Sequence, residues 1–193
     1  DRSLNRKWIP DSYKGNRFSG LFVYDIAIDL RSLFAVSTNR FEPELSSTMI
    51  EKLTENGWTK STNFMGDCLV APNSMQEELI PLLADALIDW RVTSNQARTF
   101  DLTETLAIGL SFNANKLSMA IRAELDFDQS NRAKPVIDHS IIDSVNLFVT
   151  PSANAYLSDE NSSSDAIDNA KDSLIKMIKE NLFRDSIHDR NCN

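Results

Sequence analysis

Apolar and polar residues alternate along residues 100–127, and the alternation changes phase at residues 113–116. Because side chains of a strand point alternately to its two faces, each half predicts a strand with one apolar face. The polar segment between them predicts a long antiparallel hairpin whose other face meets water. The apolar positions are Phe100, Leu102, Leu106, Ile108, Leu110 and Phe112 in the first half, then Leu117, Met119, Ile121, Ala123, Leu125 and Phe127 in the second.

Other alternating runs predict further strands at residues 18–30, 58–64 and 137–149. The first has apolar residues on both faces, which is typical of a central strand or of one covered by helices. Residues 33–36 either extend it or begin a second strand. Residues 151–165 are rich in Ser, Asn and Asp, and this composition predicts a mobile loop.

Helical spacing predicts three amphipathic helices, at about residues 43–56, 75–92 and 165–184. Pro43 suits a first turn and Gly57 stands where a C-terminal cap belongs. Residues 74–77 have the capping-box pattern. Pro81 predicts either a kink or a helix that starts there. The predicted core face of the second helix consists of Leu79, Leu82, Leu83, Ala86, Leu87 and Trp90.

These elements predict an α+β fold: an antiparallel sheet built on a long hairpin or meander, about residues 99–149, with the three helices packed on one face. A parallel doubly wound sheet needs a helix between the late strands, where none fits. The length of 193 residues predicts a single domain, residues 1–193, that carries a basic N-terminal segment at residues 1–17.

The amino-acid composition limits the kinds of partner that we expect. The net charge of −8 argues against nucleic acid as the main partner, and no apolar run is long enough to span a membrane. Residues 1–20 hold five basic and two acidic side chains, a net charge of +3, so the remainder carries −11. An acidic body suits a basic protein partner through electrostatic steering, although the same charge also keeps many proteins soluble. The oligomeric state is left open.

The two cysteines, Cys68 and Cys192, have no metal-ligand spacing. In an oxidising compartment they would form one disulfide, and in a reducing compartment they would remain thiols. The even count, with one cysteine near the C-terminal end, favours a periplasmic or secreted protein. Scattered glycines form no phosphate loop or dinucleotide fingerprint, so we expect no cofactor and no metal.

One candidate catalytic cluster combines Glu104, His139 and Asp143. Each of them lies on the same face of its predicted strand as the apolar residues of that strand. If the apolar face of each strand is turned to the core, the three side chains converge in a buried polar site suited to acid–base chemistry. Polar residues on an otherwise apolar strand face more often lie near strand ends, or form hydrogen bonds with one another that serve only the structure. A second pair, Asp25 and Asp29, is about 13 Å apart along a strand. We expect that pair to be exposed or to partner Arg31.

Three functions remain. The favoured one is a non-catalytic protein-binding module, such as an exported or periplasmic inhibitor or immunity protein, which fits the acidic body and the absence of catalytic motifs. The alternatives are a carrier for an apolar ligand between sheet and helices, and an enzyme built on the Glu/His/Asp cluster. For partner binding we expect residues 151–165 and the polar hairpin face, Arg122, Glu124 and Asp126, to be used.

Overall fold

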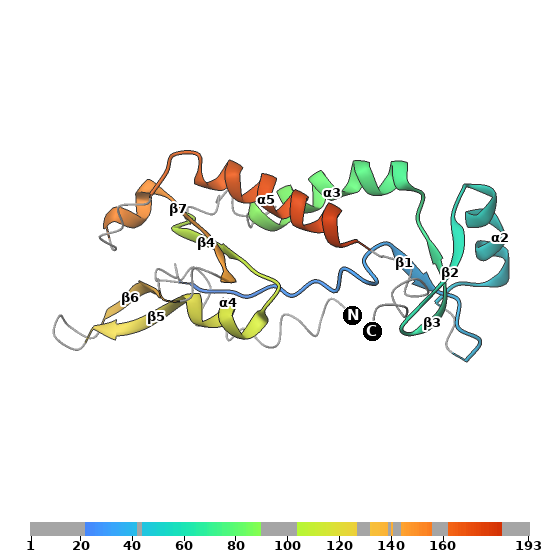
Figure 1. Ribbon diagram of the computed structural model, residues 1–193, viewed down its shortest axis with the longest axis horizontal. Coiled ribbons are helices and arrows are strands. Elements are labelled where there is room, and N and C mark those ends of the chain that lie inside the picture. Colours follow the sequence, from blue (N-terminus) through green and yellow to red (C-terminus); the bar gives the residue numbers. More distant parts are fainter. Residues whose placement is uncertain are drawn as a thin grey trace, which may run out of the picture.

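The computed structural model describes residues 22–41, 44–89, 104–126, 132–138, 140, 144–155 and 162–182. Figure 1 shows a pair of long helices, α3 and α5, with small antiparallel sheets towards the two ends of the molecule. In chain order the elements are β1 (Ala35–Ser37), α2 (Ser47–Glu55), β2 (Thr59–Asn63), β3 (Gly66–Val70), α3 (Asn73–Ile88), β4 (Ala107–Leu110), α4 (Ala114–Ala120), β5 (Ile121–Asp126), β6 (Arg132–Ile137), β7 (Asn146–Val149), the 3₁₀ helix η3 (Pro151–Ala155) and α5 (Ala166–Asn181).

A three-stranded sheet forms one end of the molecule, in the order β1-β3-β2 with all pairs antiparallel. The central strand β3 is covered on both faces, because the neighbouring residues Cys68 and Leu69 are 1% and 0% exposed. Helix α2 follows β1 and is capped by Ser46, whose side chain accepts from the amide of Met49. Gly57 ends that helix with a φ of +89°, a conformation that favours glycine.

Helices α3 and α5 pack against each other along the middle of the molecule (Figure 1). Each of the two helices carries small and branched residues that are almost fully buried: Ile80 and Ala84 on α3, and Ala170 and Ile178 on α5. Small residues such as alanine allow helices to pack closely, and buried isoleucines contribute apolar area to the core.

Strands β4 and β7 form a two-stranded antiparallel ladder that α5 contacts. Val149 is 2% exposed, and Thr150 directly after it is 7% exposed. The Thr150 hydroxyl donates to the carbonyl of Thr105 at 2.6 Å, so this buried polar group is satisfied. Burial of β7 under α5 fixes the ladder against the helix pair.

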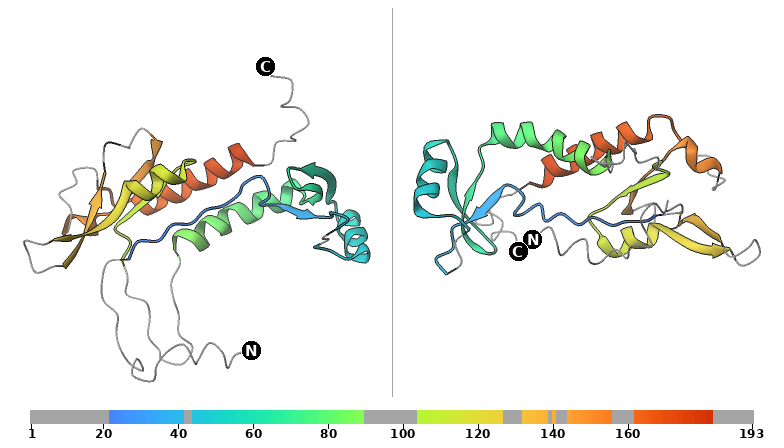
Figure 2. Two further views of the ribbon diagram at one scale, coloured as in Figure 1. Left: turned by 90° about the horizontal axis from the view of Figure 1, so that it is seen from below. Right: turned by 180° about the vertical axis from the view of Figure 1, so that it is seen from behind.

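Strands β5 and β6 form a separate antiparallel pair next to α4 (Figure 2). Gly109 of β4 lies close to this unit. A Cβ at Gly109 would be 3.0 Å from Leu117 Cδ1 and 3.5 Å from Ile121 Cδ1. The absence of a side chain at residue 109 therefore lets α4 and the start of β5 pack onto β4.

The structure confirms the α+β class with antiparallel sheets and helices. Helices α2, α3 and α5 lie within, or largely within, the ranges 43–56, 75–92 and 165–184. Helix α3 begins at Asn73, which rules out a helix that starts at Pro81. Its N-cap is Pro72 without a side-chain hydrogen bond, so the predicted capping box is not formed. The single-domain prediction remains a prediction.

The long hairpin at residues 100–127 is not confirmed. Residues 114–120 are helix α4, and β4 pairs with β7 while β5 pairs with β6. Asn113 caps α4 by accepting from the Lys116 amide at 3.1 Å. Leu117 and the buried Ala120 share one helix face, whereas Met119 is 51% exposed, so a three-residue spacing replaces the expected alternation.

Two further corrections concern strand positions. In the described part of the range 137–149, residues 146–149 form β7 and Ile137 ends β6, whereas residues 139 and 141–143 lie outside the described residues. Residues 132–135, which lie outside every predicted strand, contribute most of β6. The loop expected at 151–165 begins with η3. Polar composition misled the prediction for β6, because cross-strand pairing with β5 outweighs weak local strand propensity.

Candidate functional site

Residues 22–29 form an extended segment that joins no sheet of the described chain. Figure 1 draws it as the blue trace that leads to β1. The strand predicted at 18–30 is therefore wrong for this part, and residues 18–21 lie outside the described residues. Phe22, Val23, Tyr24 and Ile26 are 63%, 44%, 63% and 45% exposed. Alternation shows which side chains share a face, but it does not supply a neighbouring strand.

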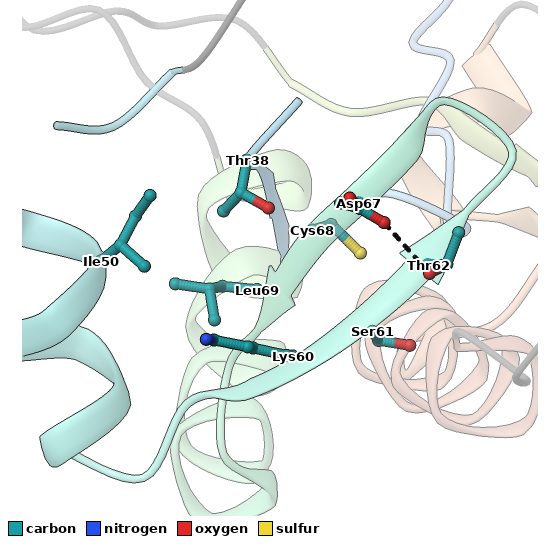
Figure 3. A pocket seen from close by; sticks show the side chains of 8 residues that line it. All are labelled: Thr38, Ile50, Lys60, Ser61, Thr62, Asp67, Cys68 and Leu69. Atoms are coloured by element: carbon teal, nitrogen blue, oxygen red, sulfur yellow. Dashed lines mark hydrogen bonds between the residues drawn. The ribbon is translucent and has the colours of Figure 1, made fainter. Parts of the chain in front are cut away.

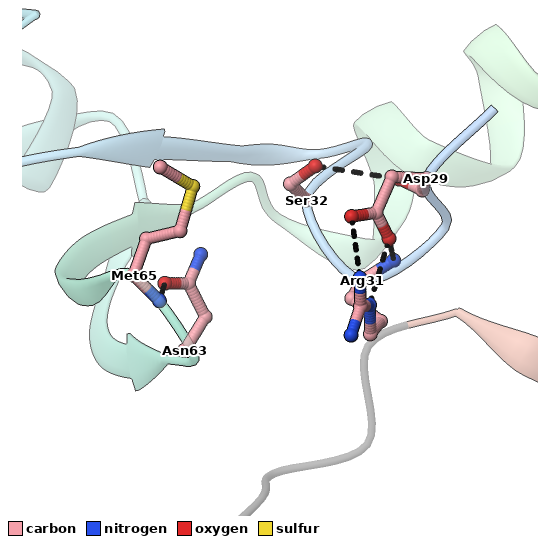
Figure 4. Close-up of polar contacts among 5 residues, drawn as sticks. All are labelled: Asp29, Arg31, Ser32, Asn63 and Met65. Carbon is pink, nitrogen blue, oxygen red and sulfur yellow. Dashed lines mark hydrogen bonds and ion pairs between the residues drawn. The ribbon is translucent and has the colours of Figure 1, made fainter.

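A tight turn ends this segment. The Asp29 carboxylate accepts from Arg31 through the backbone amide at 3.0 Å, Nε at 2.9 Å and Nη2 at 3.0 Å (Figure 4). These hydrogen bonds lower the pKa of Asp29 and raise the pKa of Arg31. The expectation that Asp29 partners Arg31 is confirmed. Because both side chains are exposed, the pair fixes the turn rather than adding much stability.

The same Arg31 reaches the β2–β3 hairpin. Its guanidinium carbon lies 4.2 Å from the ring centroid of Phe64, a cation–π contact at the hairpin tip. Asn63 holds the hairpin turn, because its side chain accepts from the Met65 amide at 2.8 Å (Figure 4). Gly66 follows with a φ of +114°, a conformation that favours glycine. Phe64 and Met65 are 55% and 62% exposed, so this tip presents a second apolar surface.

Helix α3 presents a third apolar surface, which we call the α3 outer face: Met75, Leu79, Leu82 and Ala86. The first three are 40%, 37% and 56% exposed, and Ala86 is also exposed. The prediction of a core face is wrong for Leu79, Leu82 and Ala86, because the most buried residues of α3 are Ile80 and Ala84. Leu83 and Leu87 of the predicted face are half-buried, and Trp90 lies outside the described residues. Both faces of α3 are apolar, and that property is the signal in the sequence that marks a second contact surface.

A charged contact joins α3 to α5 beside this face. Lys171 Nζ lies 3.1 Å from Asp85 Oδ1 and donates a hydrogen bond to Asp89. The hydrogen bonds to Asp89 and then Asp85 raise the pKa of Lys171. The Lys171 side chain is 19% exposed while both carboxylates are substantially exposed, so Lys171 is the shielded centre of the contact.

A hollow of about 490 Å³ lies between α2 and the three-stranded sheet (Figure 3). Hydroxyl and charged groups dominate its lining, and the Thr62 hydroxyl reaches Asp67 Oδ1 at 3.5 Å. Its lining residues are Thr38, Ile50, Lys60, Ser61, Thr62, Asp67, Cys68 and Leu69. This composition suits a small polar molecule better than an apolar ligand.

The predicted partner-binding residues Arg122, Glu124 and Asp126 all lie on β5. Arg122 Nη2 is 3.5 Å from Glu124 Oε1, and their side chains are 44% and 48% exposed. Side chains two residues apart share a face of the strand, so Arg122 and Glu124 form one polar surface. The side chain of Asp126 lies outside the described part.

The other predicted residues are not brought together by the described structure. Glu104 precedes β4 and is exposed, so it does not face the core as expected. His139 and Asp143 lie outside the described residues. Cys68 is buried in β3. Its proposed disulfide partner, Cys192, also lies outside, so the disulfide remains a prediction.

Comparisons with protein-family models, with curated proteins and with solved structures found no match for this chain. Within the described ranges, no helix is long and apolar enough to cross a membrane. In the same part of the chain, no group of three or more His, Cys, Asp or Glu side chains is placed to hold a metal ion. The apolar and charged surfaces described above therefore provide the structural basis for a functional proposal.

Proposed function

We propose that this chain is a non-catalytic protein-binding module of the inhibitor or immunity-protein kind. The observation that carries the proposal is the exposure of Phe22, Val23, Tyr24 and Ile26 within one extended segment. Large apolar side chains grouped at a surface favour contact with another protein, since burial contributes about 25 cal/mol for each Å² removed from water.

The backbone of this segment suits a particular contact. An extended, apolar and aromatic segment can add to the edge of a partner's sheet through main-chain hydrogen bonds, with alternate side chains entering pockets. Phe22, Tyr24 and Ile26 have the same parity and would enter such pockets together. The Asp29–Arg31 turn fixes the C-terminal end of the segment, which reduces the entropy lost on binding.

The structure gives less support to the two alternative functions, a carrier of an apolar ligand and an enzyme. A carrier of apolar ligands needs an apolar cavity, whereas the hollow beside α2 is lined mainly by polar groups. An enzyme built on Glu104, His139 and Asp143 needs Glu104 to face a shared site, whereas Glu104 is exposed.

The test is affinity capture from the native host with the purified chain as bait, compared with Phe22→Ser/Ile26→Ser. We expect a stoichiometric protein partner that the double variant loses. Phe112→Ser is the matched control, because Phe112 is 67% exposed on a different part of the chain. Capture of a small molecule without a protein partner would contradict the proposal, and so would a partner retained equally by the wild type and the double variant.

The β5 surface is tested in the same assay. Reversing both charges, Arg122→Glu/Glu124→Lys, keeps an ion pair along β5 and inverts its polarity. If this face contacts the partner, the capture should weaken by about fivefold or more, because like charges across an interface are unfavourable. Unchanged capture would remove β5 from the binding surface and leave the segment at residues 22–29 as the contact.

A further inference from the structure

The spacing along the α3 outer face matches a helix–helix seam. Met75, Leu79, Leu82 and Ala86 are separated by four, three and four residues, the alternation of the a and d positions of a heptad repeat. Over these residues the seam is about 16 Å long. A stripe of this kind packs against a second helix at a small crossing angle.

The opposite side of α3 already makes the intramolecular contact. Ile80 and Ala84 are 1% and 0% exposed, and Lys171 of α5 reaches Asp85 and Asp89 at one edge. A helix with apolar residues on two opposite faces normally buries both of them. The α3 outer face, in contrast, leaves Leu82 56% exposed. Among the described residues, no helix packs on this face, so it offers a helix-sized contact to another molecule.

The charges of α3 indicate which kind of helix would bind to the α3 outer face. Helix α3 contains Glu77, Glu78 and Asp85 and has no Lys or Arg, and Asp89 caps its end. Lys171 offsets only one of these four charges. Glu78 and Asp85 directly precede Leu79 and Ala86, which places them at the flanking positions that pair with charges of a facing helix. A basic helix would gain attraction along this edge.

The same charges disfavour a second copy of the chain. Two α3 helices packed antiparallel would bring Glu78 and Asp85 of each copy near the equivalent acidic positions of the other. Like charges at these positions reduce affinity and select against self-pairing. We propose that the α3 outer face docks a basic amphipathic helix of the partner protein. This inference rests on the proposed function, because it specifies the chemistry of that partner.

The probe is a labelled synthetic helix of about three heptads with Leu at a and d and Lys at e and g. A peptide with Glu at e and g and a scrambled Lys peptide of the same composition are the controls. Binding to the full chain is measured by fluorescence anisotropy at low and high salt. We expect only the Lys heptad peptide to bind, with affinity that falls as salt screens the charges.

Variants of the chain locate the contact. Leu79→Ser/Leu82→Ser should weaken binding by about tenfold or more, since buried leucines at the centre of a small contact dominate its affinity. Glu78→Lys should weaken the Lys peptide and admit the Glu peptide. Glu77→Lys is the matched control, because it makes the same charge change away from the seam. Far-ultraviolet circular dichroism checks that each variant keeps its helix content.

Several results would overturn the inference. The first is that the scrambled peptide binds as tightly as the Lys heptad peptide, and the second is that the Lys heptad peptide does not bind. The third is that the Leu79→Ser/Leu82→Ser variant binds as tightly as the wild type. The fourth is that the chain forms dimers that this variant abolishes. The last result would assign the face to a second copy. If the Lys peptide fails while host capture still depends on Phe22 and Ile26, the proposed function stands and only the α3 inference falls.

Discussion

Lys171 shows how a single side chain connects two helices. Its ammonium group, on α5, is shared by Asp85 and Asp89 of α3, and its side chain is 19% exposed. Charge-assisted hydrogen bonds to the ammonium stabilise its protonated form, so its pKa lies above the ordinary value of 10.5. Because folding raises this pKa, the contact contributes fully below the ordinary value and is lost as the pH rises through the folded pKa.

We therefore predict that Lys171→Met lowers the urea midpoint of unfolding near neutral pH. The difference from the wild type should shrink as the pH rises through the raised pKa of Lys171. Urea titrations at a series of pH values, from neutral to above that pKa, measure this. Lys176→Met is the control, because Lys176 is 73% exposed and 3.9 Å from Glu180. A pH-independent difference would show that the lost aliphatic packing, and not the charge, is responsible.

At the scale of elements, Gly109 determines how closely α4 packs on β4. A Cβ there meets the mobile end of Leu117 at 3.0 Å and Val145 Cγ1 at 3.4 Å. Gly109→Ala requires only a small shift of Leu117. Gly109→Val adds two methyl groups and should cost about 1–3 kcal/mol of unfolding free energy through overpacking.

The control for this prediction is a double-mutant cycle measured by urea unfolding. Leu117→Ala removes the nearest contact, so the combined Gly109→Val/Leu117→Ala variant should lose less stability than the sum of the two single variants. Additive losses would indicate that the strain falls on β4 itself and that the close approach of α4 is not limited by Gly109.

Sequence patterns located three of the helices, but missed α4 and the strand partners. The three helices were located because their stabilising contacts are largely periodic and local. Strand pairing depends on distant partners: β4 pairs with β7 across a helix and another strand pair, and no local pattern encodes that register. The Asp29–Arg31 pair was predicted because its partners are two residues apart.

The surfaces were harder to predict for the same physical reason. Apolar positions on both sides of α3 are compatible with either side being the core, and only the tertiary packing of the folded chain decides that Ile80 and Ala84 are buried. Likewise, alternation in residues 22–28 indicates a strand-forming segment but cannot reveal that no described strand lies beside it. The exposed apolar surfaces therefore emerge only when the contacts of the whole chain are known.

At the scale of the whole molecule, two separate regions of core stabilise the fold. Leu69 is fully buried in the three-stranded sheet, and Ile178 is 1% exposed on α5, which contacts α3, β4 and β7. Helix α3 directly follows β3 and packs on α5, so it joins the two regions mechanically. If the chain is one cooperative domain, a destabilising substitution in either region should lower the unfolding temperature of both.

We predict that Leu69→Ala and Ile178→Ala each lower the unfolding free energy by about 2–5 kcal/mol, the usual cost of truncating a buried leucine or isoleucine. Differential scanning calorimetry should show one transition in the wild type, shifted down in both variants. Leu82→Ala is the matched control: it truncates a leucine that is 56% exposed and should barely shift the transition. Two transitions, with each variant moving only one of them, would mean that the sheet at one end unfolds independently and that the chain contains two cooperative units.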